Sequence, residues 1–184
     1  GGLSVTGSLP KYLYGSNAYS LDRRTTAQAI EKISDALHLQ VNEANVTGLE
    51  FGTNFLMKHQ VSDYLAKLGS MPRLGRYHFD PSTLYYKGTG KQQPKVFVFY
   101  DKLQDIKAKG ADYPDAWKGE NLLRYEMRFK GRLPQQLEVQ EVKASTLHQV
   151  LFYGMMVKRY QDNYFSISKL NQIKTDVMSE IKTV

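Results

Sequence analysis

From Leu123 to Lys130, apolar and charged side chains alternate without a break. Successive side chains of a β-strand point to opposite faces of its sheet, so this alternation predicts a strand with one apolar and one charged face. The apolar side chains are those of Leu123, Tyr125, Met127 and Phe129. The charged ones are those of Arg124, Glu126, Arg128 and Lys130. A chain with such a strand has to bury one face of a sheet and can present the other to solvent or to a ligand.

A second segment, from Leu49 to Phe55, is divided in the same way. Its polar face carries Glu50, Gly52 and Asn54, and its apolar face carries Leu49, Phe51 and Phe55.

If the two strands are neighbours, Glu50 and Glu126 could share a divalent cation, because Mg²⁺ and Mn²⁺ prefer oxygen ligands. Arg124 and Arg128 flank Glu126 and could hold phosphates. The alternative is that both polar faces are ordinary solvated surfaces of a sheet.

The segment from Val96 to Lys102 predicts a third strand, in which Tyr100 and Lys102 share a face. A tyrosine can attack a phosphodiester if a metal polarises the phosphate and a base or a cation lowers the cost of forming the phenolate. The alternative is a half-buried aromatic residue whose hydroxyl contacts water.

Weaker patterns cover the remaining chain. Residues 3–8 predict a strand that leads into a turn at 15–17. A helix is expected over about 25–38, with Thr25 and Gln28 at capping-box spacing, and a short helix over 59–68. The expected strands are 48–55, 83–88, 95–101 and 122–130, of which the second and third form a hairpin.

A polar stretch follows over 102–120, and the end of the chain is expected to be helical. One apolar helix face consists of Leu147, Val150, Leu151, Gly154 and Val157. A second consists of Ile167, Leu170, Ile173, Val177 and Ile181.

Strands interleaved with helices predict an α+β fold. We expect a central antiparallel sheet with helices packed mainly on one face, and an open polar face that carries the site. The 184 residues suit a single domain over 1–184. Because Gly1 and Gly2 stand where an initiating Met is expected, the domain is interpreted as a fragment of a longer protein.

The charge of the chain indicates an anionic partner. Its 25 Lys and Arg against 18 Asp and Glu give a net charge of +7, and nucleic acid is the leading interpretation. Cysteine is absent, which excludes a disulfide scaffold, a cysteine zinc site and a cysteine nucleophile, and favours a reducing cytoplasm. No apolar run approaches the ~18 residues of a membrane span, and no signal peptide is visible, so no membrane is expected as a partner.

Four short segments then stand in a characteristic order. The first has Ser8, Lys11, Gly15 and Asn17, and the second has Glu50. The third is Tyr100-x-Lys102, and the fourth is Arg124-aromatic-Glu126-x-Arg128. Together, over roughly residues 3–135, they resemble the gene II / gene X family of phage and plasmid replication proteins.

The resemblance implies site-specific nicking and rejoining of one DNA strand through a covalent 5′-phosphotyrosine, which starts rolling-circle replication in the cytoplasm of a bacterial host. It places the nucleophile on Tyr100, with Lys102 beside it, and Mg²⁺ or Mn²⁺ on Glu50 and Glu126. The DNA partner is an origin, single-stranded or in a hairpin. The expected DNA-binding residues are Lys11, Asn54, Arg124 and Arg128.

The chain also departs from related nickases. Many of them hold their metal with a His-hydrophobic-His pair, whereas the histidines here are isolated, and His78 is the best candidate for a third ligand. Family members usually carry a stretch before the first segment, so part of the fold could be missing. Tyr160 or Tyr164 is the alternative nucleophile, unless both pack a helix against the sheet.

A second hypothesis is a non-catalytic module that binds single-stranded nucleic acid with Arg124, Arg128, Lys130 and exposed tyrosines. Glu50 and Glu126 speak against it, because carboxylates on that face repel phosphate.

Overall fold

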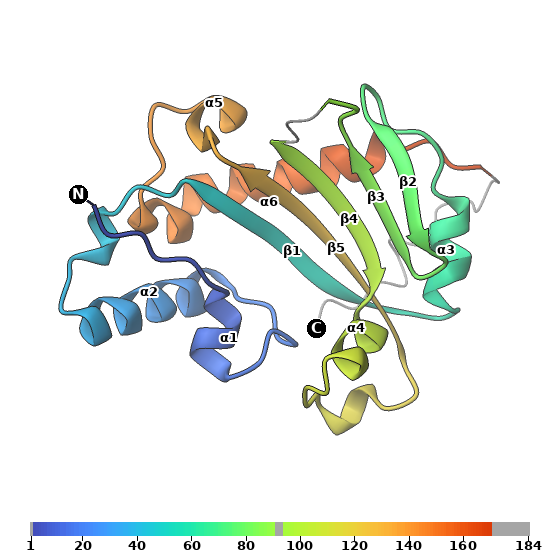
Figure 1. The fold of residues 1–184 in the computed structure, drawn as a ribbon, viewed down its shortest axis with the longest axis horizontal. Helices are drawn as coiled ribbons and strands as arrows, with labels where there is room; N and C mark the ends of the chain where they lie inside the picture. The colour runs from blue at the N-terminus through green and yellow to red at the C-terminus, as the bar shows by residue number, and fades with distance from the viewer. Residues whose placement is uncertain (1, 91–93, 171–184) are drawn as a thin grey trace.

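The computed structural model describes residues 2–90 and 94–170, in which five strands form one antiparallel sheet (Figure 1). The strands are β1 (Gly48–Met57), β2 (Gly75–Asp80), β3 (Thr83–Lys87), β4 (Lys95–Asp101) and β5 (Asn121–Lys130). Their order in the sheet is β1-β5-β4-β3-β2. The strand with the unbroken alternation, β5, therefore lies between β1 and β4, and the three strands predicted to share a sheet do share one.

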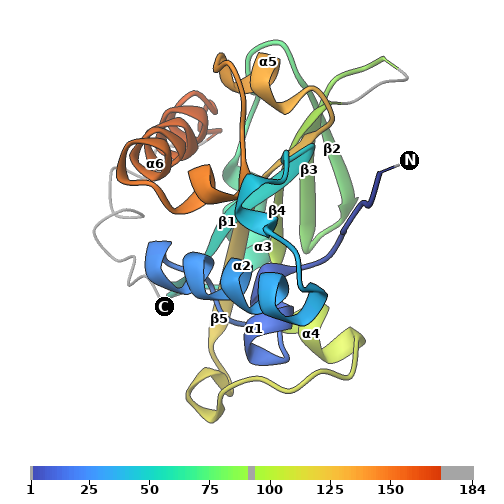
Figure 2. The same ribbon diagram turned by 90° about the vertical axis from the view of Figure 1, so that its left-hand side faces the viewer.

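Helices lie on both sides of this sheet, with the larger share on one side (Figure 2). The α-helices are α1 (Leu9–Tyr14), α2 (Arg23–Leu37), α3 (Val61–Lys67), α4 (Lys102–Ala108), α5 (Leu133–Leu137) and α6 (Val150–Phe165). Three 3₁₀ turns lie in the connections between these elements: η1 (Val41–Glu43), η2 (Asp115–Trp117) and η3 (Ala144–His148). The α+β class and the antiparallel sheet are confirmed.

The main core lies between the sheet and helices α3, α5 and α6. Its centre is a column of aromatic rings. The ring of Tyr125 in β5 lies 4.2 Å, centroid to centroid, from Phe99 of β4 on one side and from Tyr160 of α6 on the other. Full burial of such a side chain contributes about 1.5–3 kcal/mol. The apolar face that alternation assigned to β5 is thus the face that holds the molecule together.

A smaller core covers one end of the opposite face. Leu103 and Ile106 of α4, Trp117 of η2 and Ala18 pack there against Leu122, at the start of β5. Helices α1 and α2 lie beside β1 (Figures 1 and 2). The polar face therefore stays uncovered by helices over its middle and its far end.

The N-terminal prediction is wrong, because residues 3–8 form no strand and the helix α1 follows them. Its ends are set locally. The Ser8 side chain accepts from the Lys11 amide, Pro10 lies in the first turn, and Gly15 ends the helix at φ 76°. Helix α2 is confirmed, but its capping box consists of Asp22 and Thr25 instead of Thr25 and Gln28.

Strand β2 was not predicted, and the apolar face predicted for the helix that begins near residue 147 is wrong. In α6 the buried side chains are Phe152, Met156 and Tyr160, whereas Leu151 of the predicted apolar face is 88% exposed. Phe152, Met156 and Tyr160 share one face because they are spaced by four residues. The second predicted helix face begins after α6, with Ile167 buried and Leu170 exposed, and its last three members lie outside the described residues.

Candidate functional site

Strand register places the predicted site residues in three rows across β1, β5 and β4. In the first row Asn54 pairs with Arg124, which pairs with Tyr100. In the second, Gly52 pairs with Glu126, which pairs with Val98.

In the third row Glu50 pairs with Arg128, and Arg128 with Val96. Since side chains two residues apart share a face, all three rows lie on the face opposite the main core. The prediction that Glu50, Tyr100 and Glu126 share one face of one sheet is confirmed.

The carboxylate of Glu126 is the centre of the polar cluster. Its Oε1 accepts hydrogen bonds from the Tyr100 hydroxyl, at 3.1 Å, and from Nε of Arg124. Its Oε2 accepts two from Arg128, at 2.9 Å from Nε and 2.6 Å from Nη2. The residue is only 4% exposed, so two guanidinium groups and a phenol replace the water around its carboxylate.

A glycine on the neighbouring strand makes room for this carboxylate. Gly52 stands opposite Glu126, and a Cβ at Gly52 would lie 2.7 Å from Cγ of Glu126 and 2.5 Å from the carbonyl oxygen of Tyr125. Both distances are shorter than real contacts of a Cβ. The glycine in the second segment is therefore a steric requirement of the cluster.

The cluster is tied to the loop that follows α1. Nη1 of Arg124 donates to Oδ1 of Asn54 at 2.9 Å, and Nδ2 of Asn54 donates to the carbonyl oxygen of Ala18 at 2.7 Å. Asn54 is fully buried. A residue that we predicted to bind DNA is therefore a link in the scaffold that orients Arg124.

Lys102 belongs to the same neighbourhood but not to a strand. Strand β4 ends at Asp101, whose side chain caps α4, and Lys102 is the first residue of that helix. Its Nζ lies 5.8 Å from the centroid of the Tyr100 ring, donates to Oδ1 of Asn17 at 3.3 Å and lies 3.5 Å from Asp105. The predicted proximity of Lys102 to Tyr100 holds, although helix geometry and not strand alternation produces it.

Burial and charge shift the proton affinities of this cluster. Burial, and after it the negative charge of Glu126, raise the pKa of the Tyr100 hydroxyl. Burial alone would also raise the pKa of the Glu126 carboxyl, but Arg124 and Arg128 together hold that pKa below its ordinary value. Burial is the main cause that lowers the pKa of the Lys102 ammonium. At neutral pH the cluster therefore contains a protonated phenol and an ionised carboxylate.

The two candidate metal ligands lie on either side of Arg128. Nε of Arg128 is 3.5 Å from Oε1 of Glu50, while the same guanidinium bonds Glu126. Both carboxylates are suitable donors for a hard cation, but the positive charge of Arg128 lies between them, so a cation that bridged them would have to take its place. Among residues 2–90 and 94–170, no group of three or more histidine or acidic side chains is placed to hold a metal.

The other predicted candidates lie elsewhere. His78 of β2 is opposite Leu84, on the face of the main core, and therefore cannot join Glu126 as a ligand. Tyr160 and Tyr164 pack helix α6 against the sheet, and the Tyr160 hydroxyl donates to the Tyr125 carbonyl oxygen at 3.0 Å. Lys11 is exposed on α1 and is not part of the cluster.

The first of the four recognised segments now has a structural explanation. Ser8 and Gly15 delimit α1, and Asn17 bonds Lys102. The role of Asn17 was not predicted, because nothing in the sequence shows that this loop returns to the end of β4. Its only signal was its place in the family pattern.

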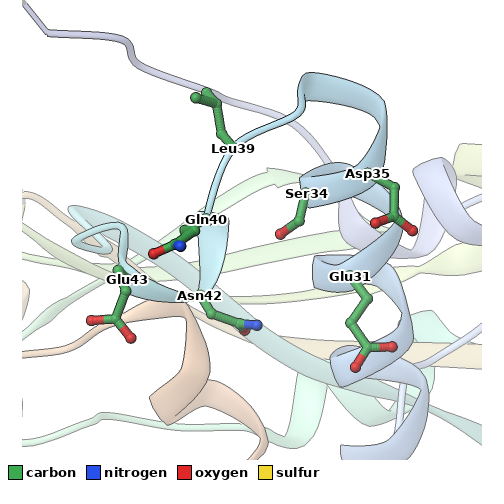
Figure 3. A pocket seen from close by; sticks show the side chains of 7 residues that line it. All are labelled: Glu31, Ser34, Asp35, Leu39, Gln40, Asn42 and Glu43. Atoms are coloured by element: carbon green, nitrogen blue, oxygen red, sulfur yellow. The ribbon is translucent and has the colours of Figure 1, made fainter.

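A surface pocket beside α2 is unsuited to a phosphate. It is lined by Glu31, Asp35 and Glu43 among others, and these carboxylates would repel an anion (Figure 3). It lies at the end of α2 and at η1, away from Tyr100 and Glu126.

Fold and cluster together define a class of protein: an α+β domain that presents a tyrosine, a carboxylate and two guanidinium groups on the open face of an antiparallel sheet. A model of one family, Phage_CRI, described as replication-associated protein G2P N-terminal, matches residues 2–150. The chain therefore belongs to this family of phage replication proteins, which implies a role in replication and binding to DNA. A search of curated proteins found no match. In the described part of the chain, every helix is too short or too polar to cross a membrane.

Proposed function

We propose that this protein initiates rolling-circle replication by nicking one DNA strand with Tyr100, in the cytoplasm of a bacterial host. The observation that carries the proposal is the hydrogen bond from the Tyr100 hydroxyl to Glu126, on a sheet face where Arg124 and Arg128 supply positive charge. A nucleophile, a proton acceptor and phosphate-binding groups are the parts that such a reaction requires.

In the proposed step, Oη of Tyr100 attacks the scissile phosphorus and gives its proton to Glu126. The bond from phosphorus to the 3′-oxygen breaks, that oxygen takes a proton from solvent, and Glu126 releases to solvent the proton that it took from Tyr100, so no net proton is gained or lost. The products are a 5′-phosphotyrosine and a free 3′-OH for a polymerase. Because the ester keeps the energy of the phosphodiester, attack by a 3′-OH reverses the step and rejoins the strand.

Binding of the scissile phosphate would prepare the proton transfer. In the free protein the raised pKa of Tyr100 and the lowered pKa of Glu126 make that transfer unfavourable. A phosphate that draws Arg124 away from Glu126 would remove one of the two charges that lower the pKa of that carboxyl, and so make it a better base. Lys102, beside the Tyr100 ring, would stabilise the developing negative charge.

A divalent cation, Mg²⁺ or Mn²⁺, remains part of the proposal. Glu50 and Oε2 of Glu126 would hold it once Arg128 has turned from Glu126 toward the DNA backbone, so that the cation replaces the charge of Arg128 while Oε1 remains the acceptor for the Tyr100 proton. A bound cation supplies Lewis-acid polarisation of the scissile phosphate. We expect EDTA to abolish adduct formation and Glu50→Gln to raise the concentration of Mn²⁺ that is needed; full activity in EDTA would exclude this part.

Incubation with a single-stranded origin oligonucleotide and Mn²⁺ tests the central claim. Wild type should form a covalent protein–DNA adduct, seen as a band shift in denaturing gels. Tyr100→Phe keeps the ring but removes the nucleophilic oxygen, so the adduct should disappear while the fold survives. Tyr164→Phe is the matched control and should form the adduct normally. An adduct that persists in Tyr100→Phe and is lost in Tyr164→Phe would assign the nucleophile to α6.

A second candidate function is a binding module without catalysis. The complete pairing of Glu126 favours it, because a structural ion pair would show the same contacts. If wild type binds single-stranded origin DNA but forms no adduct with it, that result would support the binding module.

A further inference from the structure

Three side chains of β2 and β3 continue the rows of the site across the same polar face of the sheet. Tyr85 of β3 pairs with Val98, the partner of Glu126, and Tyr77 of β2 pairs with Tyr85. Lys87 pairs with Val96, the partner of Arg128. Because their register is continuous with that of the site, Tyr77, Tyr85 and Lys87 lie on the same face as Glu126. We call these three residues the tyrosine platform.

The platform is a packed arrangement and not three independent side chains. Nζ of Lys87 lies 5.0 Å from the ring centroid of Tyr77 and 6.0 Å from that of Tyr85, so one cation contacts both rings. The Tyr77 ring lies back along its own strand over Gly75, where a Cβ would be 2.7 Å from a ring carbon. A glycine therefore makes room for the ring close to the sheet, and Tyr77 remains 39% exposed.

The platform is also accessible. Helix α6 lies behind the sheet in Figure 1, and no helix crosses in front of β3. Helix α4 covers only the end of this face where β4 stops. Strands are spaced by about 4.8 Å, so β3 lies about 10 Å from β5, within reach of the nucleotides beside a phosphate held at Tyr100.

The chemistry of the platform fits unpaired bases. Bases stack on exposed aromatic rings regardless of sequence, and a lysine beside the rings attracts the backbone. A duplex keeps its base faces inside the helix and cannot use such rings. We propose that the tyrosine platform binds the unpaired bases next to the scissile phosphate, so that this face selects single-stranded DNA. This proposal rests on the proposed function in one respect: the phosphate next to the bases is the one that Tyr100 would attack.

Binding of fluorescein-labelled oligothymidylate to the Tyr100→Phe protein tests the platform without cleavage. Tyr85→Leu and Tyr77→Leu should each raise the dissociation constant about tenfold, the usual loss for one stacked base. Tyr85→Phe keeps the ring and should bind as the parent does. Lys87→Gln should weaken binding more at low salt than at high salt. A labelled duplex should bind the two leucine variants as tightly as it binds their parent, because it cannot stack its bases on the rings.

Phe165→Leu is the matched control, because Phe165 is an exposed aromatic residue on α6, behind the sheet; its binding should be unchanged. Circular dichroism of each variant excludes misfolding as the cause. Equal affinities for Tyr85→Leu, Tyr77→Leu and their parent would overturn the platform, as would an equal loss in Phe165→Leu. If wild type forms the adduct but the leucine variants bind normally, the platform is wrong and the nicking proposal stands. Loss of binding in these variants, with no adduct from wild type, supports the platform and contradicts the nickase.

Discussion

Glu126 is held by two guanidinium groups, and this makes it a structural residue as well as a candidate catalytic one. Replacement by glutamine keeps the shape of the side chain but leaves the nearly buried Arg124 without its counter-charge. Breaking a buried ion pair in this way typically costs 3–5 kcal/mol. A lost activity in Glu126→Gln is therefore informative only if the variant is shown to be folded.

The pH dependence of stability gives the first prediction. The folded-state pKa of Glu126 is lowered below the ordinary value of 4.5, so its ion pairs stabilise the fold fully at neutral pH. That contribution is lost as pH falls below about 4.5 and through the lowered pKa. Urea unfolding from pH 7 to pH 3 should show a smaller acid-induced loss in Glu126→Gln than in wild type. Parallel curves for the two proteins would contradict the assignment.

At the scale of elements, the loop after α1 orients the cluster from outside the sheet. Asn17 bonds Lys102, and the Ala18 carbonyl oxygen holds Asn54, which in turn holds Arg124. Arg124 and Lys102, the charged neighbours of the proposed nucleophile Tyr100, thus depend on a segment that contributes no strand.

Asn17→Ala removes one of these links and is the prediction for this element. We expect it to slow adduct formation by up to about tenfold but measurably, because it leaves Asp105 as the remaining polar partner of the Lys102 ammonium without touching Tyr100 or Glu126. The free energy of unfolding should fall by about 1 kcal/mol, the value of one hydrogen bond. Asn42→Ala, on η1, is the control. An adduct rate equal to that of wild type would show that Lys102 needs no positioning from this loop.

Elements with a regular period were predictable from the sequence, and irregular ones were not. Polar and apolar side chains alternate in β1 and β5, whereas β4 was recognised as an apolar run of β-branched and aromatic residues, which is buried on both faces from Val96 to Phe99. The shared face of Glu50, Tyr100 and Glu126 follows from the two-residue period of all three strands. Polar and aromatic residues also alternate over 76–80 in β2, but this strand lies at the edge of the sheet and its aromatic residues Tyr77 and Phe79 are both exposed, so the alternation does not mark a buried face. Helix α1 is a single short segment, set by Ser8, Pro10 and Gly15, and its length is too small for a periodic signal.

The site was predictable in part for the same reason. Alternation placed Glu126 and Tyr100 on one face, but it does not specify side-chain pairing. The sequence therefore left open that both arginines would bind Glu126 rather than a phosphate. The Asn17 contact could not be inferred, because it joins residues 85 positions apart in the chain. The tyrosine platform could not be inferred because β2, which carries Tyr77, was not recognised as the partner of β3.

Across the whole molecule, the excess of positive charge predicts salt-dependent binding. Each phosphate contact adds about −0.7 to the slope of log affinity against log salt for single strands. Lys130 is exposed at the far end of the polar face, so Lys130→Gln should reduce the magnitude of that slope by about this amount. Lys158→Gln, on α6 behind the sheet, should not change it. The opposite pattern, measured by fluorescence anisotropy, would place DNA on the helical side.

The strand order has a consequence for synthesis of the protein. Strand β1 is an edge strand whose one sheet partner is β5, and β5 is made only after α3, β2, β3, β4 and α4. At 5–20 residues per second, the ribosome needs roughly 4–15 s to pass from one to the other. During that interval β5 is absent, so Glu126 is not yet paired with Gly52 and cannot accept the hydrogen bond of the Tyr100 hydroxyl. A nascent chain therefore assembles the cluster of Tyr100 and Glu126 only after β5 has left the ribosome, and the proposed reaction cannot start before that.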